Sequence, residues 1–444
     1  MKTITKYSLF ALAVLAPLFV SCERENPVKK EIVEQPEKAE VVKENNTENN
    51  EATPSSSESQ YTPPQTKLSL NEGEMTNITP GNEFTFRYFA KEFKDNKPAS
   101  VISSPLSVQF ICGMLGNQIP DNSALTEMIG IKGCIEEVNS YFNKLISDVA
   151  KIGEDTRMIV ANALMKDIGV PDFPEEFLGK LKNYYLVDYS VLEAKSLEDQ
   201  PIGERPEDLW VKGKTSGLID RAPEPVLPEM ASLFNVLCFN GTWSYTFDPN
   251  QTSNQPFYID DNATVEKPLM SRLGYYPFYK GDSFSAAILP FGNASFLFTI
   301  VLPNTGKTLD SVIEGMSAKT WNTIRENLLL KKVSLSVPRF SVSFNENNVF
   351  SYIDDSFKKS YFNQMDGLAK EGAHVFPFTR IKQKTLVEIN EEGASAATTT
   401  QASGVIDNKD SEQIEIFNAN HPFAFMISEA GSGLVLFIGT YSGS

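Results

Sequence analysis

A segment of small residues lies just ahead of the last apolar part of the chain. It runs from Glu391 to Asp407 with the sequence EEGASAATTTQASGVID, and it contains no aromatic residue and no proline. The residues that follow, Ile414–Ser442, are apolar and strand-like, so the segment is not the start of a frayed tail. Any fold of this chain must therefore hold a long small-residue segment between two core elements.

The segment has the alternation of a strand with one buried face. Side chains of a strand point to opposite faces with a period of two, and no charge interrupts the run from Gly393 to Ile406. The odd positions from Ser395 to Asp407 are mostly polar and suit a solvent face. A flexible loop that merely joins two strands is the alternative interpretation. The even positions are all small or apolar: Ala394, Ala396, Thr398, Thr400, Ala402, Gly404 and Ile406.

The rest of the chain predicts an α+β fold. Helical spacing is found in Glu83–Asp95, in Pro105–Asn117 and in Pro174–Tyr185, whereas Thr156–Asp167 has the pattern of a buried strand. From Ser232 onward the chain is rich in strand-like runs. Helices first and strands later, without regular alternation, are typical of α+β proteins.

The N-terminal residues predict export. Lys2 and Lys6 precede a short apolar run that ends at Ser21 and Cys22, which is the pattern of a signal peptide over residues 1–21. The position of Cys22 resembles the lipobox of bacterial lipoproteins, in which this cysteine is acylated; cleavage near Ser21 by an ordinary secretory route is the alternative. We therefore expect an exported, membrane-anchored bacterial lipoprotein that faces the periplasm or the cell surface.

The next segment has the composition of a tether. Residues 22–66 consist of the expected lipidated cysteine followed by Glu, Lys, Asn, Thr, Ser and Pro, with Tyr61 as the only aromatic residue. Such a segment cannot bury enough apolar surface to offset its chain entropy, so we expect a disordered acidic linker. The folded domain is then predicted over residues 67–444.

Charge and residue usage exclude several classes of function. The net charge of −17 argues against nucleic acid and against an anionic membrane surface as partners, so a membrane contact would be made only through the lipid. The three cysteines after Cys22 are odd in number and lack metal-ligand spacing, and Cys112 and Cys238 lie in apolar runs as buried thiols would. No metal and no cofactor is expected.

The chain also lacks the signature of an enzyme. It has only two histidines, His374 and His421, and no G-x-S-x-G, H-E-x-x-H or P-loop motif. His421 precedes Pro422 and an apolar run, so a structural role at the start of a strand is favoured over a role as a general base. Trp243 and Phe247 are interpreted as core anchors.

Seven motifs in series resemble those of serpins. They are SSPLSVQFICGML, TSGLID, LFNVLCFNGTWSYTFDPNQT, LPFGNASFLFTIVLPN, VSLSVPRFSVSF, VEINEEGASAATTT and HPFAFMI, and the resemblance covers Gly81–Ser444. It implies a single α+β domain with three β-sheets, about eight to nine helices and an exposed reactive loop at about 391–415.

The resemblance implies a protease inhibitor that acts as a suicide substrate. In this family a serine, sometimes a cysteine, protease attacks the reactive loop, and the cleaved loop enters the central sheet as a new strand while the acyl-enzyme persists. The partner would be the target protease in a covalent complex with a serpin monomer. Ala394 and Ser395 replace the common Thr-Glu, and both are small enough to insert. The hinge would consist of Glu391, Glu392, Gly393, Ala394, Ser395, Ala396, Ala397 and Thr398.

Serpins also have a polar cluster where the central sheet opens. Motif matching places Ser104, Ser107, Asn235 and Gln383 in it, with Gln383 where the family usually has histidine. Glutamine both donates and accepts, so a hydrogen-bonded cluster is expected without the pH response of imidazole. Ser104 before Pro105 is equally explained as a helix N-cap.

The cleaved bond and the efficiency of inhibition are less constrained. The usual hinge length places the reactive bond at Asp407–Asn408, but the loop is about four residues longer than in typical relatives. Val405 or Ile406 would attract elastase-like proteases and Lys409 trypsin-like ones. The alternative function is a non-inhibitory serpin that acts as a binding module or as a plain protease substrate.

Overall fold

The computed structural model of the chain describes a defined set of residues. These are residues 64, 66–153, 156–195, 201, 203–223, 225–346, 349–373, 375–378, 383–394 and 413–443. The chain divides into two units, Met1–Ser56 and Ser57–Ser444, and every described residue belongs to the second unit. The signal peptide and Cys22 lie outside the described residues.

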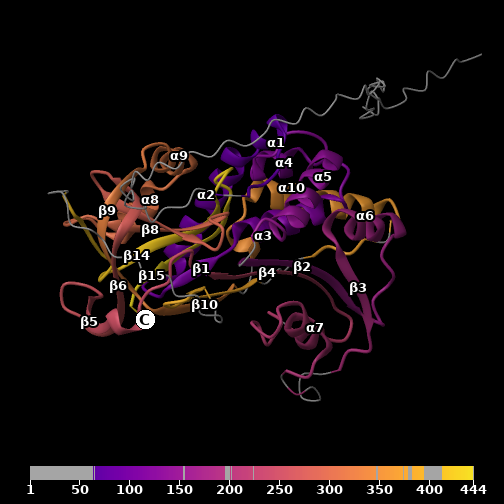
Figure 1. The fold of residues 1–444 in the computed structure, drawn as a ribbon. Coiled ribbons are helices and arrows are strands. Elements are labelled where there is room, and N and C mark those ends of the chain that lie inside the picture. Colours follow the sequence, from indigo (N-terminus) through magenta and orange to yellow (C-terminus); the bar gives the residue numbers. More distant parts are fainter. Residues whose placement is uncertain are drawn as a thin grey trace, which may run out of the picture. The chain divides into compact units, whose positions relative to one another are not determined.

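The helices are concentrated in the first half of the described chain (Figure 1). Helix α3 begins where Ser104 Oγ accepts the Ser107 N–H, and Pro105 occupies its first turn, so the N-cap expected at Ser104 is present. Apart from α1, which is a single turn, the described residues form nine α-helices. The bounds are α1 Glu72–Met75, α2 Ile78–Asn96, α3 Pro105–Gly116, α4 Ser123–Ile129, α5 Ile135–Val149, α6 Glu175–Tyr185, α7 Pro206–Lys214, α8 Leu309–Gly315, α9 Ala318–Glu326 and α10 Asp355–Lys370.

A six-stranded sheet contains the start of the small-residue segment. Its order is β10-β11-β12-β4-β2-β3, and only the β2–β3 pair is parallel among the pairings described. Helix α3 lies on one face of this sheet and α7 on the other (Figure 1). The bounds are β2 Thr156–Asp167, β3 Val187–Leu192, β4 Ala231–Thr242, β10 Phe340–Glu346, β11 Gln383–Ile389 and β12 Gly393–Ala394.

The other nine strands form two groups that are joined by a short contact. One group has the order β1-β15-β14-β8-β7, and the other has β5-β6-β9-β13. The groups meet only where Phe278–Lys280 at the end of β6 pairs with Ser285–Ala287 of β7. By their hydrogen bonds these nine strands form one sheet, so the described residues form two sheets; the three expected sheets correspond to the six-stranded sheet and the two groups of the nine-stranded one. The bounds are β1 Val101–Ser103, β5 Thr252–Tyr258, β6 Thr264–Lys280, β7 Phe284–Phe291, β8 Phe296–Pro303, β9 Leu329–Pro338, β13 Glu415–Asn418, β14 Phe423–Glu429 and β15 Val435–Tyr441.

A large apolar core joins these sheets to the helices. Strands β14 and β15 are buried along their whole length, because they lie in the middle of their sheet and carry apolar side chains on both faces. Cys112 and Cys238 are buried free thiols, as expected. Trp243 stacks on Phe291 at a centroid distance of 4.3 Å, which agrees with its interpretation as a core anchor.

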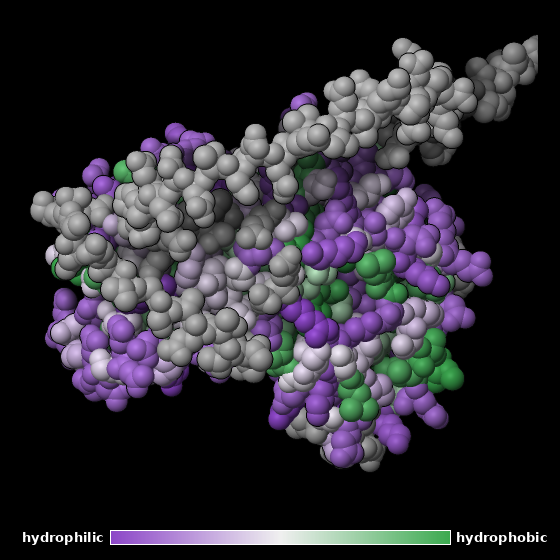
Figure 2. Space-filling view, viewed as in Figure 1, coloured by the Kyte–Doolittle hydropathy of each residue, from purple (hydrophilic) through white to green (hydrophobic). Residues whose placement is uncertain are grey.

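The visible surface is largely hydrophilic (Figure 2). A hydrophobic area in this view lies in the region of β3 and α7. Large apolar side chains that are exposed in these elements include Val191, which is 48% exposed, and Leu209, which is 55% exposed. Among the helices described, none combines the length and the apolar content that a membrane crossing requires.

Candidate functional site

The small-residue segment begins as a strand inside the six-stranded sheet. Gly393 pairs with Thr242 and Ala394 with Gly241 of β4, while Ala394 also pairs with Ile389 of β11. Strand β12 is therefore antiparallel to both neighbours. In the described chain no register pair joins β11 directly to β4, so β12 alone links the two halves of this sheet.

Ala394 is buried within the main apolar core, at 1% exposure. This is the side on which the alternation of the segment places its even positions. An alanine fits there because the neighbouring strands leave room for a methyl group but no place for a solvated charge.

Gly393 is required by the backbone. Its φ is +152°, and a Cβ atom would lie against the Gly241 carbonyl oxygen and 2.7 Å from the Thr242 Cα. Only glycine combines this conformation with so close an approach of two chains. The turn is further fixed by the side-chain oxygen of Asn390, which accepts the N–H groups of Glu392 at 2.9 Å and Gly393 at 3.1 Å.

Trp243, the residue after β4, binds this turn through two hydrogen bonds. Its backbone N–H donates to the Glu392 carbonyl over 2.8 Å, and its indole Nε1 donates to the Asn390 carbonyl over 2.9 Å. Phe247 donates its backbone N–H to the Glu391 carbonyl over 2.9 Å. The two residues interpreted as core anchors thus also bind the chain where the segment enters the sheet, which burial patterns alone did not indicate.

Glu391 holds the same turn in place through its charged carboxylate. Its carboxylate accepts from Arg339 Nε at 3.0 Å, from Arg339 Nη2, and from Thr252 Oγ1 at 2.7 Å. Burial acts to raise the pKa of this carboxyl group, but the hydrogen bonds from Arg339 and Thr252 outweigh it, and the pKa lies below its ordinary value. The carboxylate therefore stays ionised and ties the hinge to the start of β10.

Gln383 joins Ser104 at the opposite end of β11. Its Nε2 donates to the Ser104 carbonyl over 2.9 Å, and its Oε1 accepts from the Ser104 N–H at 3.3 Å and from Ser103 Oγ at 3.2 Å. Ser104 Oγ donates to the Leu436 carbonyl over 2.8 Å. Glutamine thus satisfies both peptide groups of a buried turn, using the donor and the acceptor that were expected of it.

Asn235 belongs to a separate network. Its Nδ2 donates to Asn162 Oδ1 over 2.6 Å, and Asn162 Nδ2 in turn donates to the Tyr185 carbonyl over 2.6 Å. The four residues that motif matching grouped together are therefore divided between the β11 side and the β2–β4 side of the sheet. Asn162 and Asn235 face each other in the β2–β4 register, whereas Gln383 is the first residue of β11, for which no register pair with β4 is described.

Two buried polar atoms near this division lack hydrogen-bond partners among the described residues. They are Ser107 Oγ and Asn235 Oδ1. An unpaired buried acceptor or hydroxyl costs free energy, so each atom would gain from a donor that approached it.

Sequence analysis missed several residues of this site and left others untested. Asn162 and Ser103 lie in strand runs without a distinguishing motif, and Arg339 and Thr252 lie far from Glu391 in the chain, so no local signal identified them. Among the described residues no group of histidine, cysteine or carboxylate side chains could hold a metal ion. The remaining hinge and reactive-bond candidates, Ser395, Ala396, Ala397, Thr398, Val405, Ile406, Asp407, Asn408 and Lys409, lie outside the described residues, as does His374.

Comparison with known proteins identifies the family. The family model described as serpin (serine protease inhibitor) matches residues 80–443, which is most of the chain. The chain belongs to the serpin family.

Individual serpins are distant relatives of this chain. An uncharacterized serpin-like protein of Thermococcus kodakarensis is 27% identical over 401 residues, covering 88% of this chain and 92% of its own length. The leukocyte elastase inhibitor of Homo sapiens is 27% identical over 380 residues, covering 81% of this serpin and 97% of its own length. The family is thus shared over the whole folded domain.

Solved structures confirm the fold. The native state of the thermophilic serpin tengpin matches with a TM-score of 0.70 at 18% identity, covering 86% of this chain and 97% of that one. Human thyroxine-binding globulin in complex with thyroxine matches with a TM-score of 0.68 at 19% identity, covering 84% of this chain and 99% of that one. Since thyroxine-binding globulin, in complex with thyroxine, has this fold as well, the fold alone does not decide the function of this serpin.

Proposed function

We propose that this serpin inhibits serine proteases, with cysteine proteases as a second target class, by trapping the acyl-enzyme. The observation that carries the proposal is the position of β12. The first residues after the hinge turn already pair with both β4 and β11, and the next ten residues, as far as Gly404, are uncharged and proline-free. A cleaved loop could therefore continue β12 as a full strand.

The proposed reaction has a defined balance of bonds. The protease nucleophile attacks a carbonyl carbon between Val405 and Asp410, an ester or thioester forms, and the peptide bond breaks with transfer of a proton to the leaving amine. Insertion of the segment from Gly393 onward then carries the attached protease away before water can attack the acyl group. The hydrogen bonds gained by the new strand would drive this step.

The unpartnered Ser107 Oγ and Asn235 Oδ1 support this proposal. A sheet that opens must find new partners for the polar groups between its strands, and two such groups are available. Gln383 holds the β11 side through hydrogen bonds that contain no ionisable group, so we propose that opening is insensitive to pH between about 5 and 8.

The test mixes the purified serpin with elastase-, trypsin-, subtilisin- and papain-like proteases and examines the products on denaturing gels. We expect an SDS-resistant band at the summed mass with at least one protease, and mass spectrometry should locate the cut between Val405 and Asp410. Clipping by every protease of the panel without any adduct would contradict trapping and favour the non-inhibitory alternative.

A second readout is independent of the choice of protease. Because insertion adds a strand to the sheet, we expect serpin clipped between Gly404 and Asp410 to melt at a markedly higher temperature than the intact protein. A clipped serpin that melts at the native temperature would contradict insertion, even if a covalent adduct were found.

We further propose that the protein is exported and anchored through a lipid on Cys22. The observation that supports this proposal is the order of features in residues 1–22, where two lysines are followed by an apolar run and then by Ser21 and Cys22. In cells supplied with radioactive palmitate, the full chain should become labelled and sediment with membranes, and Cys22→Ser should abolish both. An exported, unlabelled protein cleaved near Ser21 would show that the ordinary secretory route is used.

A further inference from the structure

We propose that this serpin has a second interaction surface, a groove along the free edge of β13, which binds an extended peptide segment of a partner protein as an added strand. The groove is separate from the β4–β12–β11 site, and the proposal does not depend on protease trapping. Its occupant is an apolar peptide that carries basic residues at its amino end and acidic residues at its carboxyl end.

The size of the groove favours a peptide. It has a volume of about 1360 Å³, which exceeds the 300–1,000 Å³ that is typical of pockets for small molecules. Its floor is apolar, because Leu302, Leu309 and Phe417 line it and are each less than a tenth exposed. Several residues of an extended chain fit such a space better than one compact ligand.

One wall of the groove is a strand edge without a partner in the described part of the chain. β13 is the last strand of its group and pairs with β9 in parallel, with Ile416 opposite Ser334. The N–H of Ala419 donates to the Ser336 carbonyl, so the odd positions of β13 bond to β9. By the alternation of a ladder, Ile416 directs its own N–H and C=O away from β9.

β13 is short and begins with the charged Glu415, but beyond that residue its edge lacks the usual protection against strand addition. β13 contains neither proline nor lysine, and the Ile416 side chain is 80% exposed at the groove. Tyr258, which lines the same groove, is 49% exposed. An added strand would pair its main chain with Ile416 and cover both side chains, which is the usual mode of β-augmentation.

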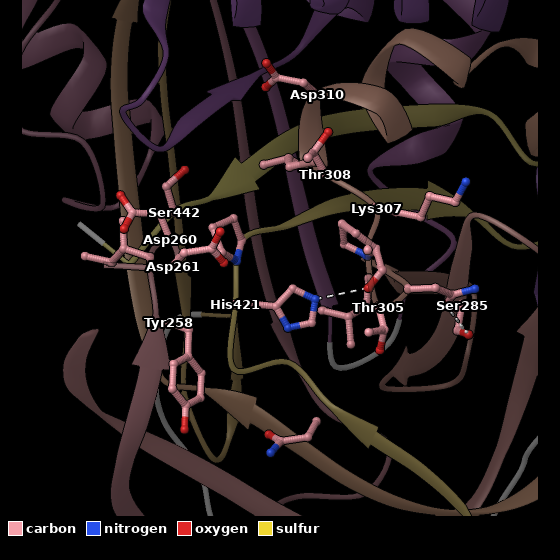
Figure 3. Close-up of a pocket in the computed structure, with 18 of the residues that line it drawn as sticks. Tyr258, Asp260, Asp261, Ser285, Thr305, Lys307, Thr308, Asp310, His421 and Ser442 are labelled. Atoms are coloured by element: carbon pink, nitrogen blue, oxygen red, sulfur yellow. Dashed lines mark hydrogen bonds between the residues drawn. The ribbon is translucent and has the colours of Figure 1, made fainter. Parts of the chain in front are cut away.

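Figure 3 shows Lys307 on one side of the groove and Asp260 and Asp261 on the other, while Asp310 is paired with Lys97. Lys280 forms an ion pair with Glu415 over 2.9 Å at the start of β13. Lys307 lies close by, because its N–H donates to the Asn304 carbonyl and Asn304 Nδ2 donates to the carbonyl of Gly281, the residue after Lys280. At the other end Tyr258 donates its N–H to the Asn420 carbonyl, and this brings Asp260 and Asp261 to the end of β13.

This polarity determines the direction of the partner peptide. A strand antiparallel to β13 would place its amino end beside Asp260 and Asp261 and its carboxyl end beside Lys307 and the Lys280–Glu415 ion pair. Basic residues at the amino end and acidic residues at the carboxyl end would then face opposite charges, together with the terminal charges of the peptide itself. Antiparallel pairing is also the more stable arrangement per residue.

The first test measures binding of a fluorescein-labelled peptide, Lys-Lys-Val-Thr-Val-Thr-Val-Glu-Glu, to the full chain by fluorescence anisotropy. Two control peptides are used: one with the Lys and Glu pairs exchanged, and one with alternate backbone nitrogens methylated. We expect binding of the first peptide, about fivefold weaker binding after charge exchange, and loss of binding after methylation.

Variants of the serpin locate the site. Ile416→Pro removes the outward N–H together with the isoleucine side chain and should weaken binding about tenfold, whereas Ile416→Thr also loses that side chain but keeps the main-chain donor and should weaken binding by less. The double change Asp260→Asn and Asp261→Asn should remove the preference for the Lys-first peptide. Asp260 and Asp261 lie on the rim of the groove, so the double variant remains informative even if Ile416→Pro unfolds at a lower temperature than the wild type.

Three results would overturn the proposal. They are no binding of the first peptide up to about 1 mM, equal binding of the methylated peptide, and equal or better binding of the charge-exchanged peptide by the unchanged serpin. Binding that is unaffected by both the Ile416 and the Asp260–Asp261 changes would also exclude this groove.

Discussion

Arg339, just before β10, donates from Nε to Oε2 of Glu391 over 3.0 Å and from Nη2 to the other carboxylate oxygen. The two residues are 52 positions apart. Glu391 immediately precedes the hinge turn that feeds β12, so this two-point contact fixes the direction in which the segment enters the sheet.

Removal of the charge on Glu391 should loosen that entry. Arg339 is 49% exposed, so we expect Glu391→Gln to lower the free energy of unfolding by only about 1 kcal/mol at pH 7, and by less in high salt. Thermal or urea unfolding measures the difference. Glu388→Gln is the matched control, because Glu388 lies on β11 with an exposed side chain, and it should change stability by less than half as much.

The same pair predicts a pH dependence. Because the folded-state pKa of Glu391 lies below its ordinary value of 4.5, its contribution is present above that value and is lost as the pH falls through the lower folded-state pKa. The stability difference between wild type and Glu391→Gln should therefore be constant above about pH 5.5 and shrink in acid. A difference that grows as the pH falls would contradict the pairing.

Gly393→Ala should disrupt β12. The added Cβ atom would meet the Gly241 carbonyl and the Thr242 Cα, so we expect a loss of about 2 kcal/mol or more and a larger fraction of clipped serpin in the trapping assay. Gly179→Ala in α6 is the control. Nothing lies within 4 Å of a Cβ atom at that position, so this change should be neutral or stabilising.

Gln383→Ala should leave the buried peptide groups of Ser104 without partners. We expect a loss of about 2–3 kcal/mol in unfolding experiments, because the alanine side chain has no polar atom to replace the amide. Lys384→Ala, the next residue of β11, removes only a long contact of 3.5 Å to Asp220 and should cost much less. Equal effects of the two changes would contradict the role assigned to Gln383.

Ala396→Arg should convert the inhibitor into a substrate. The alternation of the segment assigns Ala396 to the buried face, so insertion would bury an unpaired charge and the acyl-enzyme would be hydrolysed before trapping. The covalent band on denaturing gels should decrease while clipped serpin increases. Ser395→Arg, on the opposite face, should retain the covalent band; loss of trapping in both variants, or in Ser395→Arg alone, would contradict the assigned facing.

The sequence by itself determined the family, the α+β class and the composition of the segment that follows the hinge. Motif order and period-two alternation are local properties, so they identified Gly393, Ala394 and Gln383 without a structure. The same analysis proposed a reactive bond between Val405 and Asp410 and a lipid on Cys22, and these stay predictions, since both lie outside the described residues.

Only the tertiary structure decided which side chains meet. Sequence reasoning grouped Asn235 with Gln383 and did not foresee the partner that the β2–β4 register gives Asn235, which is Asn162. Folded coordinates were also required to find Arg339 beside Glu391 and the open edge of β13 beside Asp260. Hydrogen bonds and ion pairs depend on the relative positions of strands that are distant in the chain. Composition and spacing therefore specify which groups need partners, whereas the packing of the sheets selects the partners.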